Sequence, residues 1–88
     1  MMLHELKEHY AVYPELVVRP INEDGTAAEN ASPLYEWIGR LYNYEGPTEV
    51  QKTSRGQALG RDAARAAGVV WWKAEIENYR LPPAEPAN

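Results

Sequence analysis

The sequence predicts an α+β domain, with a short N-terminal helix, a three-stranded antiparallel sheet and a long C-terminal helix packed on the sheet. Two stretches of the first half, "ELVVRPI" and "LYEWIGRLYNY", are rich in β-branched and aromatic residues, as strands are. An alanine-rich run in the second half has helical periodicity. A chain of 88 residues forms one domain, which we assign to residues 1–80 with a flexible proline-rich tail at 81–88.

The N-terminal part is expected to hold the short helix and the first strand. "LHELKEHY" places Leu3, Leu6 and Tyr10 at helical spacing. The strand "ELVVRPI" contains Pro20, which cannot donate to a ladder, so this strand lies at the sheet edge or ends there. "NEDGTAAENASP" follows as a loop because it combines Asp-Gly, small residues and a closing proline.

The stretch "LYEWIGRLYNY" is expected to be the central strand because both of its faces are apolar. Alternation puts Tyr35, Trp37 and Leu41 on one face and Leu34, Ile38 and Tyr42 on the other. Gly39 inside the strand indicates a bulge or a close backbone approach. After the turn "EGPT", the segment "TEVQKT" predicts a short third strand whose single apolar side chain is Val50.

The C-terminal helix is expected to begin near Ser54. Ser54 and Gln57 fit an S-x-x-Q capping box, in which the two side chains satisfy backbone N–H groups reciprocally. The apolar stripe of this helix would then consist of Leu59, Ala63, Ala66 and Val70.

Gly68 leaves two alternatives for the end of the chain. Glycine commonly caps a helix, and "VVWW" has strong strand propensity, which would make a fourth strand of residues 69–76. Against this, "KAEIENYR" consists of good helix formers, Lys73 and Glu77 form an i,i+4 pair, and a glycine inside a helix costs only about 1 kcal/mol. We favour the helix, continuing to about Tyr79.

The adjacent Trp71 and Trp72 must face different surroundings on a helix, because consecutive residues lie about 100° apart. Trp71 is expected to cover the sheet. Trp72 belongs to a second stripe, which needs a cover from the N-terminal segment, a dimer mate or a partner, and this stripe is the candidate protein-binding site: Val69, Trp72, Ile76 and Tyr79.

The two stretches that come near a metal-binding or a phosphate-binding motif have the wrong spacing. "HELKEH" separates its histidines by one residue more than the zincin pattern, and "GQALGR" lacks the spacing, lysine and hydroxyl of a phosphate loop. There is no cysteine. We therefore expect no metal, no cofactor and no enzymatic activity. Because no apolar run approaches the roughly 20 residues of a membrane span, we also expect a cytoplasmic protein without a membrane partner.

The uneven distribution of charge along the chain indicates an alternative function. The net charge is -4, but residues 1–50 hold nine acidic and three basic side chains, whereas residues 51–88 hold six basic and four acidic ones. Basic side chains around a helix start favour phosphate. The alternative is thus a nucleic-acid-binding domain that uses the basic residues Lys52, Arg55, Arg61 and Arg65.

The order of a hairpin, "TSRGQALGRDAARAAG" and a tryptophan-bearing helix resembles the tails of small phage- or prophage-encoded accessory proteins, including some anti-CRISPR proteins. The resemblance covers about the second half of the chain and carries over no functional residue. We expect a small non-enzymatic protein-binding module, an inhibitor of a host or defence protein, whose partner is another protein or a homodimer mate.

Overall fold

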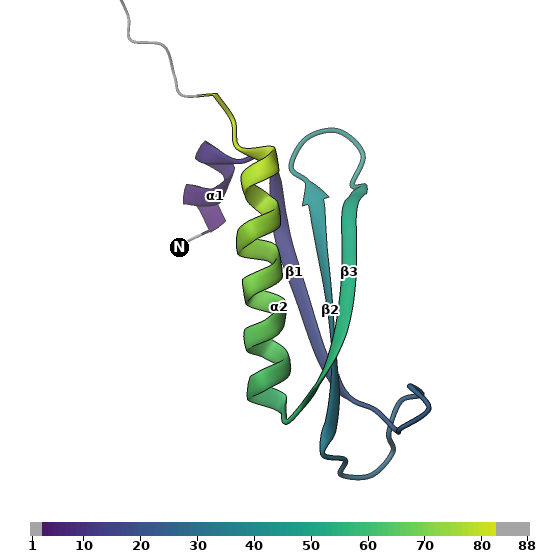
Figure 1. Ribbon diagram of the computed structural model, residues 1–88. Helices are drawn as coiled ribbons and strands as arrows, with labels where there is room; N and C mark the ends of the chain where they lie inside the picture. The colour runs from purple at the N-terminus through teal and green to yellow at the C-terminus, as the bar shows by residue number, and fades with distance from the viewer. Residues whose placement is uncertain (1–2, 83–88) are drawn as a thin grey trace, which may run out of the picture.

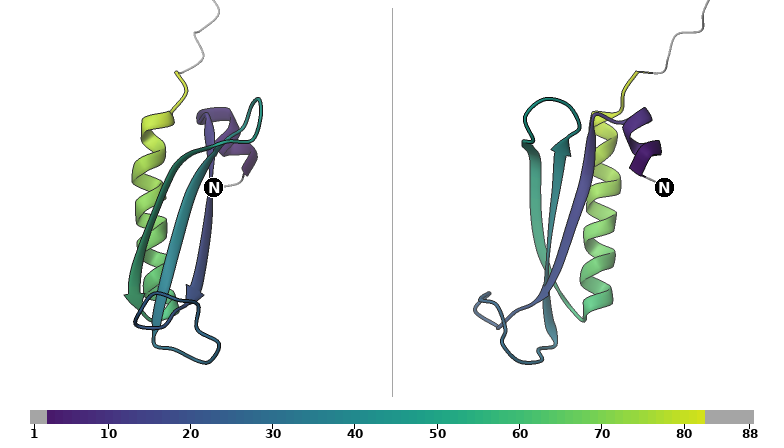
Figure 2. Two further views of the ribbon diagram at one scale, coloured as in Figure 1. Left: turned by 90° about the vertical axis from the view of Figure 1, so that its right-hand side faces the viewer. Right: turned by 180° about the vertical axis from the view of Figure 1, so that it is seen from behind.

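In the computed structural model, which describes residues 3–82, one antiparallel sheet carries the long helix on a single face (Figures 1 and 2). This arrangement confirms the predicted α+β fold. Residues 83–88 of the predicted tail lie outside the described part. The elements in chain order are α1 (Leu3–His9), β1 (Val12–Pro20), β2 (Leu34–Asn43), β3 (Val50–Leu59), α2 (Arg61–Glu75) and the 3-10 turn η1 (Ile76–Tyr79).

The sheet has the order β1-β2-β3, so the doubly apolar strand is central, as its sequence predicts. Leu16 pairs with Gly39 and Gly39 with Ser54, which puts these three residues on one face. This is the face that α2 covers, whereas Ile38 and its neighbours occupy the open face. β1 is an edge strand and ends at Pro20, which also agrees with the sequence.

Close backbone approach explains two of the glycines. A Cβ built on Gly39 would lie 2.5 Å from the ring of Trp71, so the absent side chain makes room for the tryptophan that α2 presents to the sheet. A Cβ on Gly68 would overlap a methyl carbon of Leu16. Gly68 therefore sits inside α2 as a contact point with β1, and the helix continues through it, as favoured from the sequence.

The expected start of the C-terminal helix is wrong. β3 continues to Leu59, Gly60 turns the chain with a φ of 90°, and α2 begins at Arg61. Ser54 therefore lies within β3, where it pairs with Gly39, and no capping box with Gln57 forms. Pairing along β2 overrides the local helix signal, because the small residues at 54, 56 and 58 leave space on the face that α2 covers.

The expected apolar stripe of the helix is wrong for the same reason. Leu59 is in the strand and is 74% exposed, and Val70 is 70% exposed. The residues of α2 that are buried are Ala64 and Gly68, one turn apart. The side of α2 that faces the sheet carries Ala64, Gly68 and Trp71, so the small residues Ala63 and Ala66 remain exposed.

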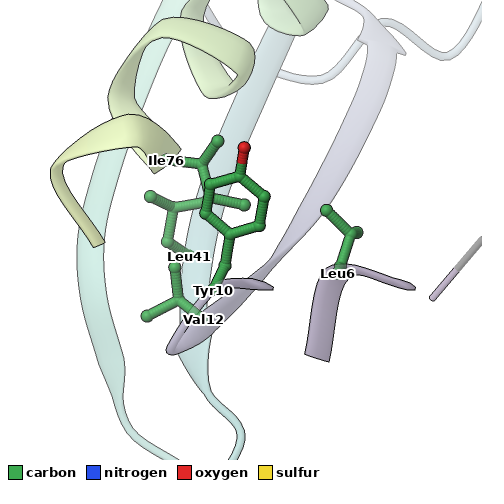
Figure 3. Packing of buried hydrophobic residues seen from close by; sticks show 5 residues of the cluster. All are labelled: Leu6, Tyr10, Val12, Leu41 and Ile76. Carbon is green, nitrogen blue, oxygen red and sulfur yellow. The ribbon is translucent and has the colours of Figure 1, made fainter. Parts of the chain in front are cut away.

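The main core lies where α1, the start of β1, β2 and η1 meet. Figure 3 shows the ring of Tyr10 close to Ile76, Leu41 and Val12, with its hydroxyl at the upper end, and Leu6 on α1 further to the side. Leu41 is fully buried and Val12 nearly so. The N-terminal and C-terminal ends of the fold are thus packed into one cluster, which positions the groove described next.

Candidate functional site

A groove separates α1 from the C-terminal half of α2. Its volume is about 510 Å³. Apolar and aromatic side chains make up most of its lining, and the charged Lys73 and Glu77 belong to it as well. The residues that line this α1–α2 groove are Leu6, Tyr10, Val69, Trp72, Lys73, Ile76 and Glu77.

The two adjacent tryptophans lie in different surroundings. The ring of Trp71 lies against the sheet, with its centroid 5.9 Å from that of Trp37 and its edge over Gly39. Trp72 lines the groove. Both rings are half-buried, and both pack against the main core cluster. Trp71 thus contacts the sheet, whereas Trp72 faces the groove.

The four residues expected to bind a protein are placed at different depths. Val69 and Trp72 line the groove and are partly exposed. Ile76 also lines it but is only 2% exposed, so it belongs to the core beneath. Tyr79 is half-buried against the same core, and its carbonyl accepts a hydrogen bond from the Ala11 amide at 2.9 Å. Of the four, Val69 and Trp72 are therefore the two that line the groove and are also partly exposed.

A hydrogen-bonded cluster of Tyr10, Glu77 and Arg80, here called the Tyr10 clasp, lies beside the groove, which Tyr10 and Glu77 help to line. The Tyr10 hydroxyl donates to Glu77 Oε1 at 2.7 Å and accepts from Arg80 Nη2 at 2.9 Å. Arg80 Nε donates to Glu77 Oε2 at 3.0 Å, and the guanidinium lies 5.1 Å from the centre of the Tyr10 ring. The Leu81 amide also donates to the His9 carbonyl at 2.8 Å, so the clasp joins the two ends of the domain.

The clasp changes the pKa values of its members. Hydrogen bonds from Arg80 and then from Tyr10 lower the pKa of the Glu77 carboxyl below its ordinary value. The hydrogen bond to Glu77, followed by desolvation, raises the pKa of the Tyr10 phenol. The depressed pKa of Glu77 means that its stabilising contribution is present above the unfolded-state value, about pH 4.3, and is lost as pH falls through the folded-state value.

We expect Glu77→Gln to lower the melting temperature at pH 7, because glutamine loses the charge that holds Arg80. The difference from the wild type should shrink at an acidic pH below the lowered folded-state pKa of Glu77, where the wild-type carboxylate is itself protonated. Thermal melts at both pH values measure this, with Glu29→Gln in the exposed β1–β2 loop as the matched control. A difference at pH 7 no larger than that of Glu29→Gln would show that the clasp adds no stability.

The four basic residues of the alternative function do not form one surface. Lys52 pairs with Leu41 and Arg55 with Ile38, so their side chains leave β3 on opposite faces of the sheet. Arg61 and Arg65 are exposed in the first turns of α2, at the other end of the helix from the β2–β3 turn near Lys52 (Figure 1). Lys52 and Arg55 were expected to lead into the helix that carries Arg61 and Arg65, but the longer β3 and the later helix start separate the two pairs.

The open face of the sheet carries a buried carboxylate. Glu36 is 4% exposed and lies between two arginines, with Arg19 at 3.5 Å and Arg55 at 3.7 Å. Further along the same face Arg40 donates to Glu15 at 3.0 Å, and Tyr13 stacks on Tyr42 with ring centroids 5.6 Å apart. Arg55 thus already faces a carboxylate, which reduces the positive charge that it offers to phosphate.

Within residues 3–82, no group of three or more His, Cys, Asp and Glu side chains is arranged to hold a metal ion. In the same range, no helix has the length and apolar character required to cross a bilayer. Comparison of the chain with protein-family models gives no match, and comparisons with curated proteins and with solved structures give no match either.

Sequence reasoning missed the second wall of the groove. The helical spacing of Leu6 and Tyr10 indicates a helix with an apolar side, but it does not show that this side lies opposite Trp72. That pairing depends on the contact between residues 9–11 and 79–81, which are distant in sequence. The N-terminal segment, one of three covers considered for the second stripe, therefore covers part of it.

Proposed function

We propose that this chain is a small non-enzymatic protein-binding module that receives its partner in the α1–α2 groove. The observation that carries the proposal is the position of Trp72, a large aromatic side chain that is half-buried in the wall of an apolar groove beside the partly exposed Val69. Tryptophan is enriched among the residues that dominate binding energy, because it offers a large contact area with few rotatable bonds.

The groove fits an amphipathic helix of the partner. Its two walls are helices, and its 510 Å³ lies within the usual range of roughly 300–1,000 Å³ for binding pockets. Apolar anchors one turn apart would contact Leu6, Val69 and Trp72, in the helix-in-groove mode. Lys73, which is exposed beside the groove, would pair with an acidic residue of that partner helix.

Inhibition of a host or defence protein is the consequence of binding that we propose. The resemblance of the second half to small phage-encoded accessory proteins is the feature behind this part of the proposal. Nucleic-acid binding is the second candidate. The dispersal of Lys52, Arg55, Arg61 and Arg65 favours protein binding over it. Affinity for random DNA and RNA that falls steeply with salt would reverse this order.

The test is selection of a displayed library of random helical peptides against the full chain, followed by binding measurements with the enriched peptides. We expect peptides with apolar residues at i, i+3 or i+4. Trp72→Ala should weaken their binding by about 2 kcal/mol or more, roughly 30-fold, which is the scale of an interface hot spot. Val70→Ala is the matched control, because Val70 is 70% exposed on another side of α2.

Because Trp72 also packs against the core, circular dichroism must show that Trp72→Ala is folded. Lys73→Glu gives a second reading that leaves the packing intact, since Lys73 is exposed, and it should weaken peptides with an acidic residue next to their anchors. Peptides that bind equally to wild type and to both variants would contradict the proposal, as would peptides whose binding is lost only in Val70→Ala.

A further inference from the structure

The two walls of the α1–α2 groove come from opposite ends of the chain. Leu6 and Tyr10 form the α1 wall. The α2 wall consists of the other lining residues, Val69, Trp72, Lys73, Ile76 and Glu77. Helix α1 has only seven residues, and an isolated helix shorter than roughly 12–15 residues is marginal in water. The position of the α1 wall therefore depends on its contacts with the rest of the fold.

Tyr10 connects α1 to the α2 wall. Its amide donates to the Leu6 carbonyl at 2.7 Å, so Tyr10 is bonded to the last turn of α1. Its ring is buried in the core, and its hydroxyl reaches the clasp, where it bonds to Glu77 and Arg80. Because Tyr10 is joined to the last turn of the helix, a shift of Tyr10 also shifts Leu6.

Arg80 is the member of the clasp that does not line the groove. Its side chain is 57% exposed, yet it donates from two nitrogens, from Nε to Glu77 and from Nη2 to Tyr10. One planar guanidinium thus fixes the carboxylate of the α2 wall relative to the phenol of the α1 wall. The residues on either side of Arg80 hydrogen-bond to the backbone of residues 9 and 11, which keeps its side chain beside the end of α1.

We propose that Arg80 is a positioning residue of the binding site, which sets the separation of the two walls without contact with the partner. A partner helix seated between Leu6 and Trp72 depends on this separation, since a gap of about 0.5–1 Å already removes a large part of the dispersion attraction between apolar groups. The use of the groove rests on the proposed function, whereas the separation of its walls can be measured with no partner present.

Distances between two spin labels test the separation, because the chain contains no cysteine that would compete for the label. Glu8→Cys on α1 and Val70→Cys on α2 provide two exposed positions, one on the helix of each wall. Double electron–electron resonance should give one narrow distance distribution for this pair. Addition of Arg80→Ala should shift the distribution outward and broaden it, whereas Arg65→Ala, at an exposed arginine of α2, should leave it unchanged.

A second variant and a reference pair separate positioning from general loosening of the fold. Tyr10→Phe keeps the ring in the core and removes only the hydroxyl, so it should shift the distribution in the same direction. It decides the question where circular dichroism shows that Arg80→Ala is unfolded. Labels at Thr53 on β3 and Val70 on α2 form the reference pair, which should be unchanged in both variants because neither label is on α1.

Peptide binding measures the consequence of a displaced wall. Arg80→Ala should weaken the binding of a peptide enriched in the display selection about fivefold or more, the lower end of the usual coupling between separate sites. In the Arg80→Ala chain, Leu6→Ala should weaken binding by a smaller factor than in the wild type, because its wall is already displaced. Val69→Ala, on the α2 wall, should weaken binding by the same factor in both chains.

Spin-label distances that neither Arg80→Ala nor Tyr10→Phe changes would overturn the positioning role and leave the proposed function intact. A reference pair that changes as much as the pair across the groove would also overturn it, because the loss would then be one of general stability. If the selection yields no peptide that depends on Trp72, the proposed function fails, and the spin-label distances still decide whether Arg80 sets the separation of the walls.

Discussion

Trp71→Ala should lower the free energy of unfolding by about 3–5 kcal/mol, the range typical of a large aromatic removed from a packed site. The ring of Trp71 fills the space above Gly39 and contacts Trp37, so its removal leaves a cavity between α2 and the central strand. The surrounding backbone cannot close this cavity readily, because Gly39 lies in the hydrogen-bonded ladder between β1 and β3.

Urea melts of Trp71→Ala and Trp72→Ala measure this effect and compare the two rings. A small domain has only about 5–15 kcal/mol of stability, so a partly unfolded population is expected for Trp71→Ala at room temperature. Trp72→Ala should lose less, because one side of that ring faces the groove. Equal losses of unfolding free energy for the two variants would mean that both rings stabilise the core and would contradict the role of Trp72 as a binding residue.

Leu41→Ala should destabilise the fold by about 2–5 kcal/mol. Leu41 is fully buried at the point where β2 meets Tyr10, Val12 and Ile76. These residues come from both ends of the chain and from the middle strand, so a cavity here weakens contacts that no other part of the domain replaces.

Leu59→Ala is the matched control for Leu41→Ala, because it makes the same chemical change at a leucine that is 74% exposed. Its effect should stay within about 0.5 kcal/mol, as for most surface positions. Urea melts of both variants give the comparison. A loss for Leu59→Ala as large as that for Leu41→Ala would contradict the placement of the core.

The elements that could be predicted are those whose pattern of apolar residues in the sequence matches their position in the fold. Alternating apolar residues on both faces of "LYEWIGRLYNY" require cover on both faces, and the strand is central. The helix through Gly68 could be favoured because "KAEIENYR" supports it on one side and the alanine run on the other. The role of Gly68 could not be found, since it depends on Leu16, more than fifty residues earlier.

The start of α2 could not be predicted because two tendencies compete there. Ser54 and Gln57 have the residue types and spacing of a helix cap, which is a local signal. The longer β3 is stabilised instead by pairing with residues 34–41 of β2 and by the fit of the Trp37 ring at Gly56, which are distant contacts.

Only part of the candidate site could be predicted, because the rest depends on contacts between residues that are distant in sequence. The angular separation of Trp71 and Trp72 follows from helix geometry alone, and it identifies Val69 and Trp72 as a surface distinct from the sheet contact. The depth of Ile76 and the position of Leu6 depend on how the N-terminal helix docks, which the Tyr10 clasp determines through Glu77 and Arg80.

Fluorine NMR of the chain labelled with 5-fluorotryptophan tests the central claim most directly, because the three tryptophans give three signals. Single Trp→Phe variants assign the signals to Trp37, Trp71 and Trp72. On addition of a peptide enriched in the display selection, we predict that the Trp72 signal shifts and that the Trp37 and Trp71 signals stay in place. A bound peptide that shifts Trp37 or Trp71 and leaves Trp72 unchanged would contradict the assignment of the α1–α2 groove as the binding site.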